Sequence, residues 1–340
     1  MPAVSVVVPT HGGSRRLPAT LEALDAAPPP PGGAEIIVVD DGSDEPVPPA
    51  LAAGRRHPVR ILRHEPNRGR AFACNRGIEA ARGRVVLVLD DDMSLDPEAL
   101  AGHGAAHPEG APPAGVIGRI DPDPDRFRGR FGRFLAAEEA RRRERMLAAA
   151  DDVPFALCLT GHFSAPRDVL LAAGGYDERF DRYGFEDIDL AWRLSRAGVR
   201  LRYRDDLAAL HRSDHAASFS LHCRRHRDAG RMAVRFAAGR DDPELEAVLR
   251  VRRGRPAGRL TAYRAAVAAS QWIVRALPPG RTRDGLLALA RWKVAAWERL
   301  GMPDRLLHAA YHVVRDMHYA AGIADELARG PRGGHRAERR

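Results

Sequence analysis

Short runs of consecutive apolar residues recur along the first 90 residues, and helical patterns fill two of the intervals between them. Four runs are rich in β-branched residues and read as buried strands, at residues 4–8, 35–39, 59–62 and 85–89. Helices are predicted at residues 17–27 and 70–81. Continuous rather than alternating apolar runs are typical of strands covered on both faces, so the pattern predicts a largely parallel sheet flanked by helices.

The middle of the chain has a looser pattern, with shorter apolar segments and more turn residues. We expect a loop at residues 121–125, helices at 133–150, 167–173 and 188–197, and strands at 155–164 and 199–203. These segments continue the alternation of strands and helices, so the predicted fold class is α/β, with a mostly parallel, Rossmann-like sheet.

Ala, Arg and Leu dominate the chain after residue 222, and Gly and Pro divide it into helical stretches. Four helices are predicted, at residues 223–238, 259–277, 283–300 and 303–328. We therefore expect an α/β domain over residues 1–222, a basic α-helical region over 223–330 and a disordered tail over 331–340.

Composition narrows the class of protein. The chain has 340 residues, of which 44% are hydrophobic, so fibrous and wholly disordered proteins are excluded. No run approaches the roughly 18 uncharged apolar residues of a membrane span. The three cysteines are too widely spaced for a disulfide framework or a zinc knuckle, and the first residues lack the features of a signal peptide. We expect a cytoplasmic protein.

Charge divides the chain into two parts. Residues 1–220 carry 29 basic and 33 acidic groups, whereas residues 221–340 carry 25 basic and 12 acidic groups. This asymmetry indicates two roles, because a basic tail can face phosphates, anionic lipid or nucleic acid. A solvated, Arg-rich helical surface explains the tail equally simply.

Carboxylates follow two of the predicted strands. Asp40 and Asp41 end the second strand, and three aspartates, 90–92, follow the fourth. In an open parallel sheet, ligands bind beyond the carboxyl ends of the strands. Asp40-Asp41-Gly42-Ser43 is also a good turn sequence, but a helix cap needs one aspartate rather than three. Asp90, Asp91 and Asp92 therefore indicate a site for a divalent cation, and oxygen ligands suit Mg²⁺ or Mn²⁺.

A second acidic cluster begins a predicted helix. Glu186 and Asp187 lie where the helix dipole favours an ionised carboxylate, which is what a general base needs, whereas Asp189 fits a helix cap. His211 and His215 follow the next strand and are candidate metal ligands.

Two phosphate-binding motifs are absent. The residues after the first strand, PTHGGS at 9–14, match neither the dinucleotide-binding G-x-G-x-x-G pattern nor a P-loop. A diphosphate would therefore be neutralised by a metal ion and arginine rather than by a glycine-rich loop.

Taken together and in order, these segments resemble the inverting glycosyltransferases of family 2, which have a GT-A fold. The resemblance covers about residues 3–220 and depends on several groups of residues rather than on one motif. They are VSVVVPT at 4–10, IIVVDDGS at 36–43, NRG at 67–69 and 75–77, LDDD at 89–92, GGYDE at 174–178, and GFEDIDL at 184–190 with RL at 193–194 and AG at 197–198.

The resemblance implies a nucleotide-sugar site. Pro9 and His11 would line the base pocket, and Asp40 or Asp41, with Asp41 favoured, would contact the nucleobase. Asn67 would also bind the nucleotide sugar.

The remaining acids and histidines would serve the sugar, the metal and the reaction. Asp90 or Asp91 would lie near the ribose, Asp92 and His211 would bind the metal, and His215 is a second candidate for the histidine ligand. Asp187 is similar to the catalytic base of the family, with Glu186 beside it.

The reaction implied is metal-dependent transfer of a sugar from a nucleotide-diphosphate donor, with UDP favoured, to an acceptor hydroxyl. Asp187 would remove the proton of that hydroxyl, and a single displacement would invert the anomeric carbon. The acceptor would be a glycan, a lipid-linked molecule or a small molecule, as in the assembly of cell-envelope polysaccharide. The segment TGHF at 160–163 departs from the family pattern, which more often has a small polar residue or Asn at the position of His162.

Other classes remain open at this stage. A nucleotidyltransferase would need a Gly- and Lys-rich anion loop near the first strand, and the sequence has none there. The Arg-rich tail could belong to a nucleic-acid-binding protein, but it contains no recognised DNA- or RNA-binding motif, so no specific nucleic-acid partner is expected. Residues 260–277 combine Trp272 with arginines, as in a helix that lies on the cytoplasmic face of an anionic membrane. Core packing or a homodimer contact explains the same apolar stripe and is the favoured interpretation.

Overall fold

The computed structural model describes residues 2–212, 218–238 and 262–330, together with residues 240, 242 and 245. Its chain divides into two compact units. We call residues 1–181 and 186–217 the α/β unit, and residues 182–185 and 218–340 the helical unit. After the loop 182–185, the described part of the helical unit continues at Ser218 and enters a helix at Phe219, so residue 222, where the predicted α/β domain ends, lies inside a helix.

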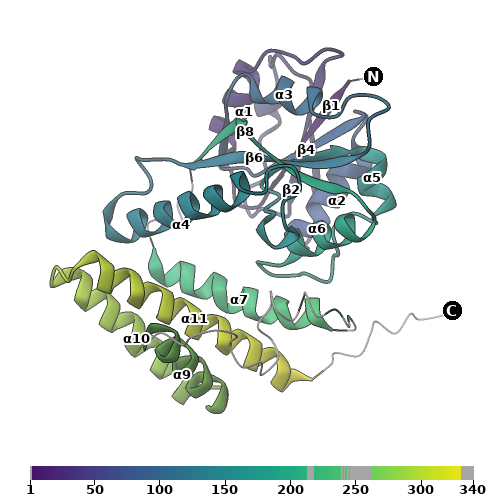
Figure 1. Cartoon of the computed structure of the whole chain (residues 1–340). Helices are drawn as coiled ribbons and strands as arrows, with labels where there is room; N and C mark the ends of the chain where they lie inside the picture. The colour runs from purple at the N-terminus through teal and green to yellow at the C-terminus, as the bar shows by residue number, and fades with distance from the viewer. Residues whose placement is uncertain are drawn as a thin grey trace. The chain divides into compact units, whose positions relative to one another are not determined.

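Eight strands of the α/β unit form one mixed sheet (Figure 1) in the order β3-β2-β1-β4-β7-β6-β8-β5. Their bounds are β1 Val4–Thr10, β2 Ala34–Asp41, β3 Val59–His64, β4 Val85–Leu89, β5 Met93–Leu95, β6 Ala114–Pro122, β7 His162–Pro166 and β8 Arg200–His211. Strands β3, β2, β1 and β4 are parallel to one another, and β6 and β8 are parallel to each other. Strands β7 and β5 are antiparallel to theirs. The predicted α/β class with a mostly parallel sheet is confirmed.

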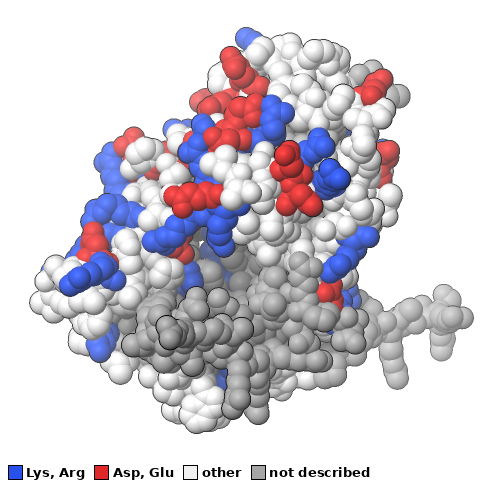
Figure 2. All heavy atoms as spheres, viewed as in Figure 1, with Lys and Arg blue, Asp and Glu red and all other residues white. Residues whose placement is uncertain are grey.

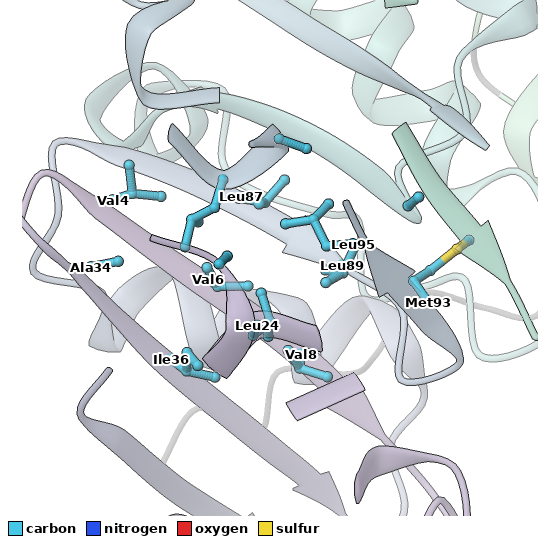
Figure 3. Packing of buried hydrophobic residues seen from close by; sticks show 14 of the residues in the cluster. Val4, Val6, Val8, Leu24, Ala34, Ile36, Leu87, Leu89, Met93 and Leu95 are labelled. Atoms are coloured by element: carbon cyan, nitrogen blue, oxygen red, sulfur yellow. The ribbon is translucent and has the colours of Figure 1, made fainter. Parts of the chain in front are cut away.

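Helices cover both faces of this sheet. They are α1 Leu17–Ala26, α2 Arg70–Ala80, α3 Ala99–Ala105, α4 Gly129–Leu147, α5 Arg167–Ala172 and α6 Glu186–Arg196, with short 3₁₀ helices at Pro49–Ala52 and Phe155–Leu157. Side chains along a strand alternate between the two faces. Val4, Val6 and Val8 of β1 therefore lie in one buried cluster with Leu24 of α1 (Figure 3). Leu21 of α1 belongs to the same cluster.

The opposite face of β1 packs against α2 at very short range. A Cβ atom on Gly77 would lie 2.2 Å from the Cγ1 atom of Val7, so only glycine lets α2 approach the strand this closely.

Three segments differ from the sequence prediction. Residues 155–161 are not a strand, because the amide groups of Leu157 and Cys158 bond to carbonyls three residues earlier, at Pro154 and Phe155, rather than to a neighbouring strand. The strand predicted at 199–203 continues to residue 211, and the loop predicted at 121–125 starts later, because β6 runs to residue 122 and pairs with β8 beyond an irregularity at residues 118/119.

The helical unit consists mainly of α7 Phe219–Ala237, α9 Ala262–Ala276, α10 Arg281–Arg299 and α11 Asp304–Arg329. Helix α11 packs against each of the other three. The expected helical C-terminal region is confirmed, whereas the tail predicted to be disordered, 331–340, lies outside the described residues.

Acidic and basic side chains lie next to one another on the face of the molecule that Figure 2 shows. Ion pairs between exposed side chains of the described residues include Arg204–Asp206 and Arg76–Glu79. Among the described helices, none combines the length and apolar composition that crossing a membrane requires.

Candidate active site

The carboxyl ends of β1, β2 and β4 meet at one edge of the sheet, because the three strands are parallel neighbours. Most of the polar residues singled out from the sequence follow these strands or the loops beside them. The structure therefore brings together candidates that are far apart in the chain, such as Asp92 and His211, through the contacts described below.

Asp40 holds the turn after β2. Its carboxylate is fully buried and accepts hydrogen bonds from the amides of Ser43 and Val47, at 3.0 and 3.1 Å, and from Arg63 Nη1 at 2.6 Å. Burial alone raises the pKa of Asp40, but these hydrogen bonds outweigh it and leave the pKa below its ordinary value. Asp40 is thus ionised, and its carboxylate is hydrogen-bonded to the backbone of the loop that follows it.

Asp41 fixes the loop that carries Asn67. Its two oxygens accept hydrogen bonds from the amides of Arg68 and Gly69, each at 2.8 Å, and His64 Nε2 lies 2.5 Å from Oδ1. The backbone at Gly42 runs so close that a Cβ atom there would lie 2.7 Å from the Asn67 nitrogen. The side chain of Asn67 in turn accepts a bond from the amide of Gly69 at 3.1 Å.

The loop after β1 joins the same group. His11 is exposed, and its Nδ1 lies 2.9 Å from the Asp41 carbonyl, while the Gly12 amide donates to Ser43 Oγ at 2.9 Å. Pro9 is buried in β1, beside Val39 of β2. The predicted base-pocket residues therefore share one edge of the sheet, with His11 as the exposed member.

Arg70 joins Asp90 to Asp187. Its Nε and Nη2 donate to Asp90 Oδ1 at 3.1 and 2.9 Å, and its Nη1 donates to Asp187 Oδ1 at 2.9 Å. The guanidinium also lies over the ring of Tyr176, 5.7 Å from the ring centre. Two acids that are far apart in the sequence thus meet on one planar cation, which can bond to both because of its forked shape.

Asp187 lies in the first turn of α6, with one carboxylate oxygen engaged and one open. Its Oδ1 accepts hydrogen bonds from Arg70 and from the hydroxyl of Thr160. Among the described residues, none donates a hydrogen bond to Oδ2, and the side chain is 17% exposed. This carboxylate is oriented through one oxygen and can accept a proton on the other. Glu186, beside it, is buried.

Asp91 is engaged by β1 and α1. It is buried and accepts hydrogen bonds from Thr10 at 2.6 Å and from Arg16 Nε and Nη2 at 3.2 and 3.0 Å. Burial raises the pKa of Asp91, although the bonds from Arg16 and Thr10 oppose the rise. Of the two residues predicted near the ribose, Asp90 has the more exposed side chain, 35% against 11% for Asp91. The Asp91 carboxylate is used to connect β1 and the start of α1 to the end of β4.

Asp92 and His211 face each other across a strand pair. Strand β5 pairs with β8 so that Met93 lies opposite His211, which places His211 Nε2 3.4 Å from Asp92 Oδ2. Burial lowers the pKa of His211, but the Asp92 carboxylate outweighs this effect and leaves the pKa above its ordinary value. The position therefore favours positive charge. His215 lies outside the described residues.

This pair fits a divalent cation. An oxygen and a nitrogen 3.4 Å apart can both bind one ion at about 2.0–2.2 Å. Among the described residues, there is no group of three or more His, Cys, Asp or Glu side chains that could hold a metal by itself. A cation at Asp92 and His211 would thus need ligands from a substrate, as Mg²⁺ often takes from phosphates.

His162 belongs to the core rather than to the open edge. It is fully buried, its Nε2 lies 2.9 Å from His103 Nε2, and its Nδ1 lies 3.1 Å from the Arg119 carbonyl. This departure from the family pattern is part of a buried hydrogen-bond network that includes His107 and Ser164.

Two site residues, Arg70 and Thr160, are missing from the sequence prediction. A cation in the first turn of a helix opposes the helix dipole, so Arg70 at the start of α2 is electrostatically unfavourable unless nearby acids compensate for it. That mismatch is a usable signal. Thr160 carries no such signal, because its neighbours in the sequence do not indicate that its hydroxyl contacts Asp187.

Comparison with known proteins places these features in context. The model of the family "Glycosyl transferase family 2" matches residues 5–169. The uncharacterized glycosyltransferase YfnE of Bacillus subtilis is 22% identical over 250 residues, which are 61% of this chain and 64% of that protein. The pre-mycofactocin glycosyltransferase of Mycobacterium tuberculosis is 28% identical over 150 residues, which are 43% of this chain and 30% of that protein. The chain thus spans less than two thirds of either relative.

Two solved structures share the fold. A mannosyltransferase from Pyrobaculum calidifontis, in complex with GDP-Man and Mn²⁺, superposes with a TM-score of 0.62 at 18% identity and covers 97% of this chain and 88% of its own. S. aureus TarS (residues 1–349), in complex with UDP-GlcNAc, has a TM-score of 0.53 at 16% identity and covers 97% of this chain and 92% of its own. At these identities the likeness establishes the fold.

Proposed function

We propose that this chain, whose residues 5–169 match the model of glycosyl transferase family 2, moves a sugar from a nucleotide-diphosphate donor to an acceptor hydroxyl, with Asp187 as the general base. The observation that carries the proposal is the pairing of Asp90 and Asp187 on Arg70. It joins the end of β4, where the donor would bind, to the start of α6, where the proton would be removed.

The donor nucleotide would bind along the ends of β1 and β2. His11 offers an exposed ring next to the Asp41 carbonyl, and Asn67 lies in the loop that Asp41 fixes. Because the oxygens of Asp40 and Asp41 are already hydrogen-bonded to loop amides, the two acids would shape the base pocket chiefly by holding these loops. Asp90, which is the more exposed acid beside Arg70, is favoured over Asp91 for the ribose.

Asp92 and His211 would hold Mg²⁺ or Mn²⁺ together with the donor diphosphate. When bound, the cation would offset the negative charge of the leaving nucleoside diphosphate. Arg70 would add a fixed positive charge nearby, and it would keep Asp187 oriented by its bond to Oδ1.

Asp187 Oδ2 would accept the acceptor's proton as its oxygen attacks the anomeric carbon. The new bond forms on the face opposite to the departing diphosphate, so the anomeric configuration inverts. Removing the base should slow this step by about 10²–10⁴-fold.

The test begins with the donor. A panel of UDP-, GDP- and dTDP-sugars is screened by thermal shift with Mn²⁺ and with EDTA, because a ligand of the folded state raises its stability. Release of the nucleoside diphosphate is then measured for Asp187→Asn and for a matched control, Asp206→Asn, which alters an exposed acid paired with Arg204.

We expect Asp187→Asn to bind the donor like the unmodified protein and to lose at least about 100-fold in turnover, whereas Asp206→Asn should retain it. Near-normal turnover in Asp187→Asn would show that the base is another group. A donor that binds equally well in EDTA would remove the metal from the proposal. A homodimer and the identity of the acceptor stay predictions.

A further inference from the structure

Two tryptophans of the helical unit are exposed. Trp272 of α9 is 71% exposed and Trp292 of α10 is 66% exposed. Ile273 of α9 is 46% exposed, and Leu289 and Leu300, in and just after α10, are 59 and 76% exposed. Several large apolar side chains exposed on two consecutive helices indicate an interaction site.

Helical spacing puts these residues on the sides of α9 and α10 that are turned away from the helical core. Leu289 and Trp292 are three residues apart in α10, and Leu300, at the end of that helix, continues the same stripe. Val294 and Leu287, on the opposite side of α10, are buried.

Helix α9 has the same arrangement. Val274 is fully buried and packs in one cluster with Leu287 and with Met317 of α11, whereas Trp272, two residues earlier, points to the other side. Part of the apolar stripe thus forms the helical core, as the favoured interpretation of the sequence has it, but both tryptophans are outside that core.

Basic residues surround the exposed stripe. Residues 262–300 contain seven basic and two acidic residues. Arg281, Lys293 and Arg299 of α10 are exposed, on either flank of the Leu289–Leu300 stripe, and one of the acids, Asp284, is paired with Arg227 of α7. An apolar centre with Trp and Leu and a basic rim is the composition of helices that lie on an anionic bilayer.

We propose that this surface, the α9–α10 outer face (Trp272, Ile273, Leu289, Trp292 and Leu300 with their basic rim), binds the surface of an anionic lipid bilayer. Tryptophan rings suit the boundary between lipid headgroups and acyl chains, and the basic rim is attracted to anionic headgroups. A second copy of the chain is a poorer partner, because two faces with the same net positive charge would be brought together. If the proposed function holds, a membrane-bound acceptor would be met at this surface.

The test is flotation of the full chain with two kinds of vesicle. One kind contains phosphatidylcholine alone, and the other also contains roughly 30% phosphatidylglycerol, whose anionic headgroups attract basic side chains. No donor is added, so the result does not depend on the catalytic proposal. The variants are Trp272→Ser/Trp292→Ser and Lys293→Glu/Arg299→Glu. The matched control is Leu147→Ser/Leu171→Ser, which changes two exposed apolar residues of the α/β unit.

We expect the unmodified protein and the control to float with the anionic vesicles only, and each test variant to bind at least about tenfold more weakly. Circular dichroism of each variant checks that its helices are intact. Binding of the tryptophan variant at the original strength would overturn the proposal, and so would failure of the unmodified protein to float. A dimer in light scattering that only the tryptophan variant dissociates, without vesicle binding, would assign the face to a second copy instead.

Discussion

Arg70 is the residue on which the geometry of the site depends most. It bonds to Asp90 with two of its nitrogens and to Asp187 with the third, which a lysine cannot reproduce with its single ammonium group. We expect Arg70→Lys to reduce turnover by about 10–100-fold through loss of the oriented base.

The matched control is Arg76→Lys in the same helix, where the exposed side chain pairs, among the described residues, with Glu79. Turnover of each variant is measured at saturating donor, together with its melting temperature. Equal turnover in Arg70→Lys and Arg76→Lys would mean that the bridge between the acids does not contribute to catalysis.

The candidate site could be predicted from the sequence where it consists of acids after strands, and less well where it depends on contacts between distant segments. Asp92 and His211 are neighbours because strand register places them so. Asp40 and Asp91 belong to the same motifs, yet their carboxylates fasten loops and helices. Motif spacing does not separate an acid that faces a ligand from one that faces its own backbone.

Buried histidines make stability depend on pH. The pKa values of His107 and His162 are lowered to about 4, and that of His103 is also lowered, chiefly because burial disfavours their charged forms. The charged groups near them are arginines, Arg84 and Arg202 beside His107 and Arg204 beside His103, which act in the same direction.

Below the ordinary histidine pKa of about 6.5, the unfolded chain binds protons that the folded chain does not. The free energy of unfolding should therefore fall as pH drops from 6.5 toward 4.5, by up to about 1.4 kcal/mol per pH unit for each such histidine. His211, whose pKa is raised, acts in the opposite direction. Asp40, whose pKa is lowered, adds its own loss only at more acidic pH.

Urea denaturation at pH 7.5, 6.5 and 5.5 measures this dependence. His107→Gln should show a shallower fall over the same range, because one titrating group is removed while a hydrogen-bonding partner for the Ser164 hydroxyl is retained. A free energy of unfolding that is the same at pH 5.5 and 7.5 would contradict the assignment of these histidines as neutral.

At the scale of elements, the helical unit depends on a close crossing of α7 and α11. A Cβ atom on Gly322 of α11 would lie 1.8 Å from the Arg227 carbonyl oxygen, and one on Gly230 of α7 would lie 2.1 Å from that of Tyr319. Backbone atoms fill both positions, so neither helix can make room without moving as a whole. We expect Gly322→Ala to destabilise the protein by about 1–3 kcal/mol or more.

Gly285→Ala in α10 is the matched control, since no atom lies within 4 Å of its added Cβ. Alanine is the better helix former, so this variant should be more stable by up to about 1 kcal/mol. Thermal and chemical unfolding followed by circular dichroism compares the two. If both alanine variants were equally stable, the crossing would have to be looser than described.

Elements with a strong local pattern could be predicted, and elements defined by pairing could not. Strand β4 is an unbroken apolar run, and the structure has it at the predicted residues. The pattern predicts no element at residues 93–117, where β5, α3 and the start of β6 lie. Strand β6 depends on pairing with its neighbours: Val116 and Ile117 pair with β7 on one side, and residues 114–122 pair with β8 on the other.

At the scale of the whole molecule, the short loop 182–185 belongs to the helical unit although both of its flanks belong to the α/β unit. Phe185 has a φ of +73°, a conformation that costs a bulky residue about 1–3 kcal/mol. Its ring lies 5.8 Å from that of Phe236 and 6.5 Å from that of Tyr319. These contacts hold the residue two positions before Asp187.

We expect Phe185→Ala to lower turnover by about tenfold while donor affinity is retained, because a misplaced base slows the reaction without affecting the donor site. Leu147→Ala, an exposed residue at the end of α4, is the control. Turnover and the donor dissociation constant are measured for both. An equal loss of affinity and turnover would indicate general loss of structure rather than misplacement of Asp187.

Because the chain passes between the two units at 181/182, 185/186 and 217/218, no single cut separates them. The helices after residue 218 are therefore not a module that can be exchanged for the corresponding part of a relative by joining two chains at one point. A chimaera would also have to carry the loop at 182–185 that matches its new helices, so the two regions of sequence are expected to change together.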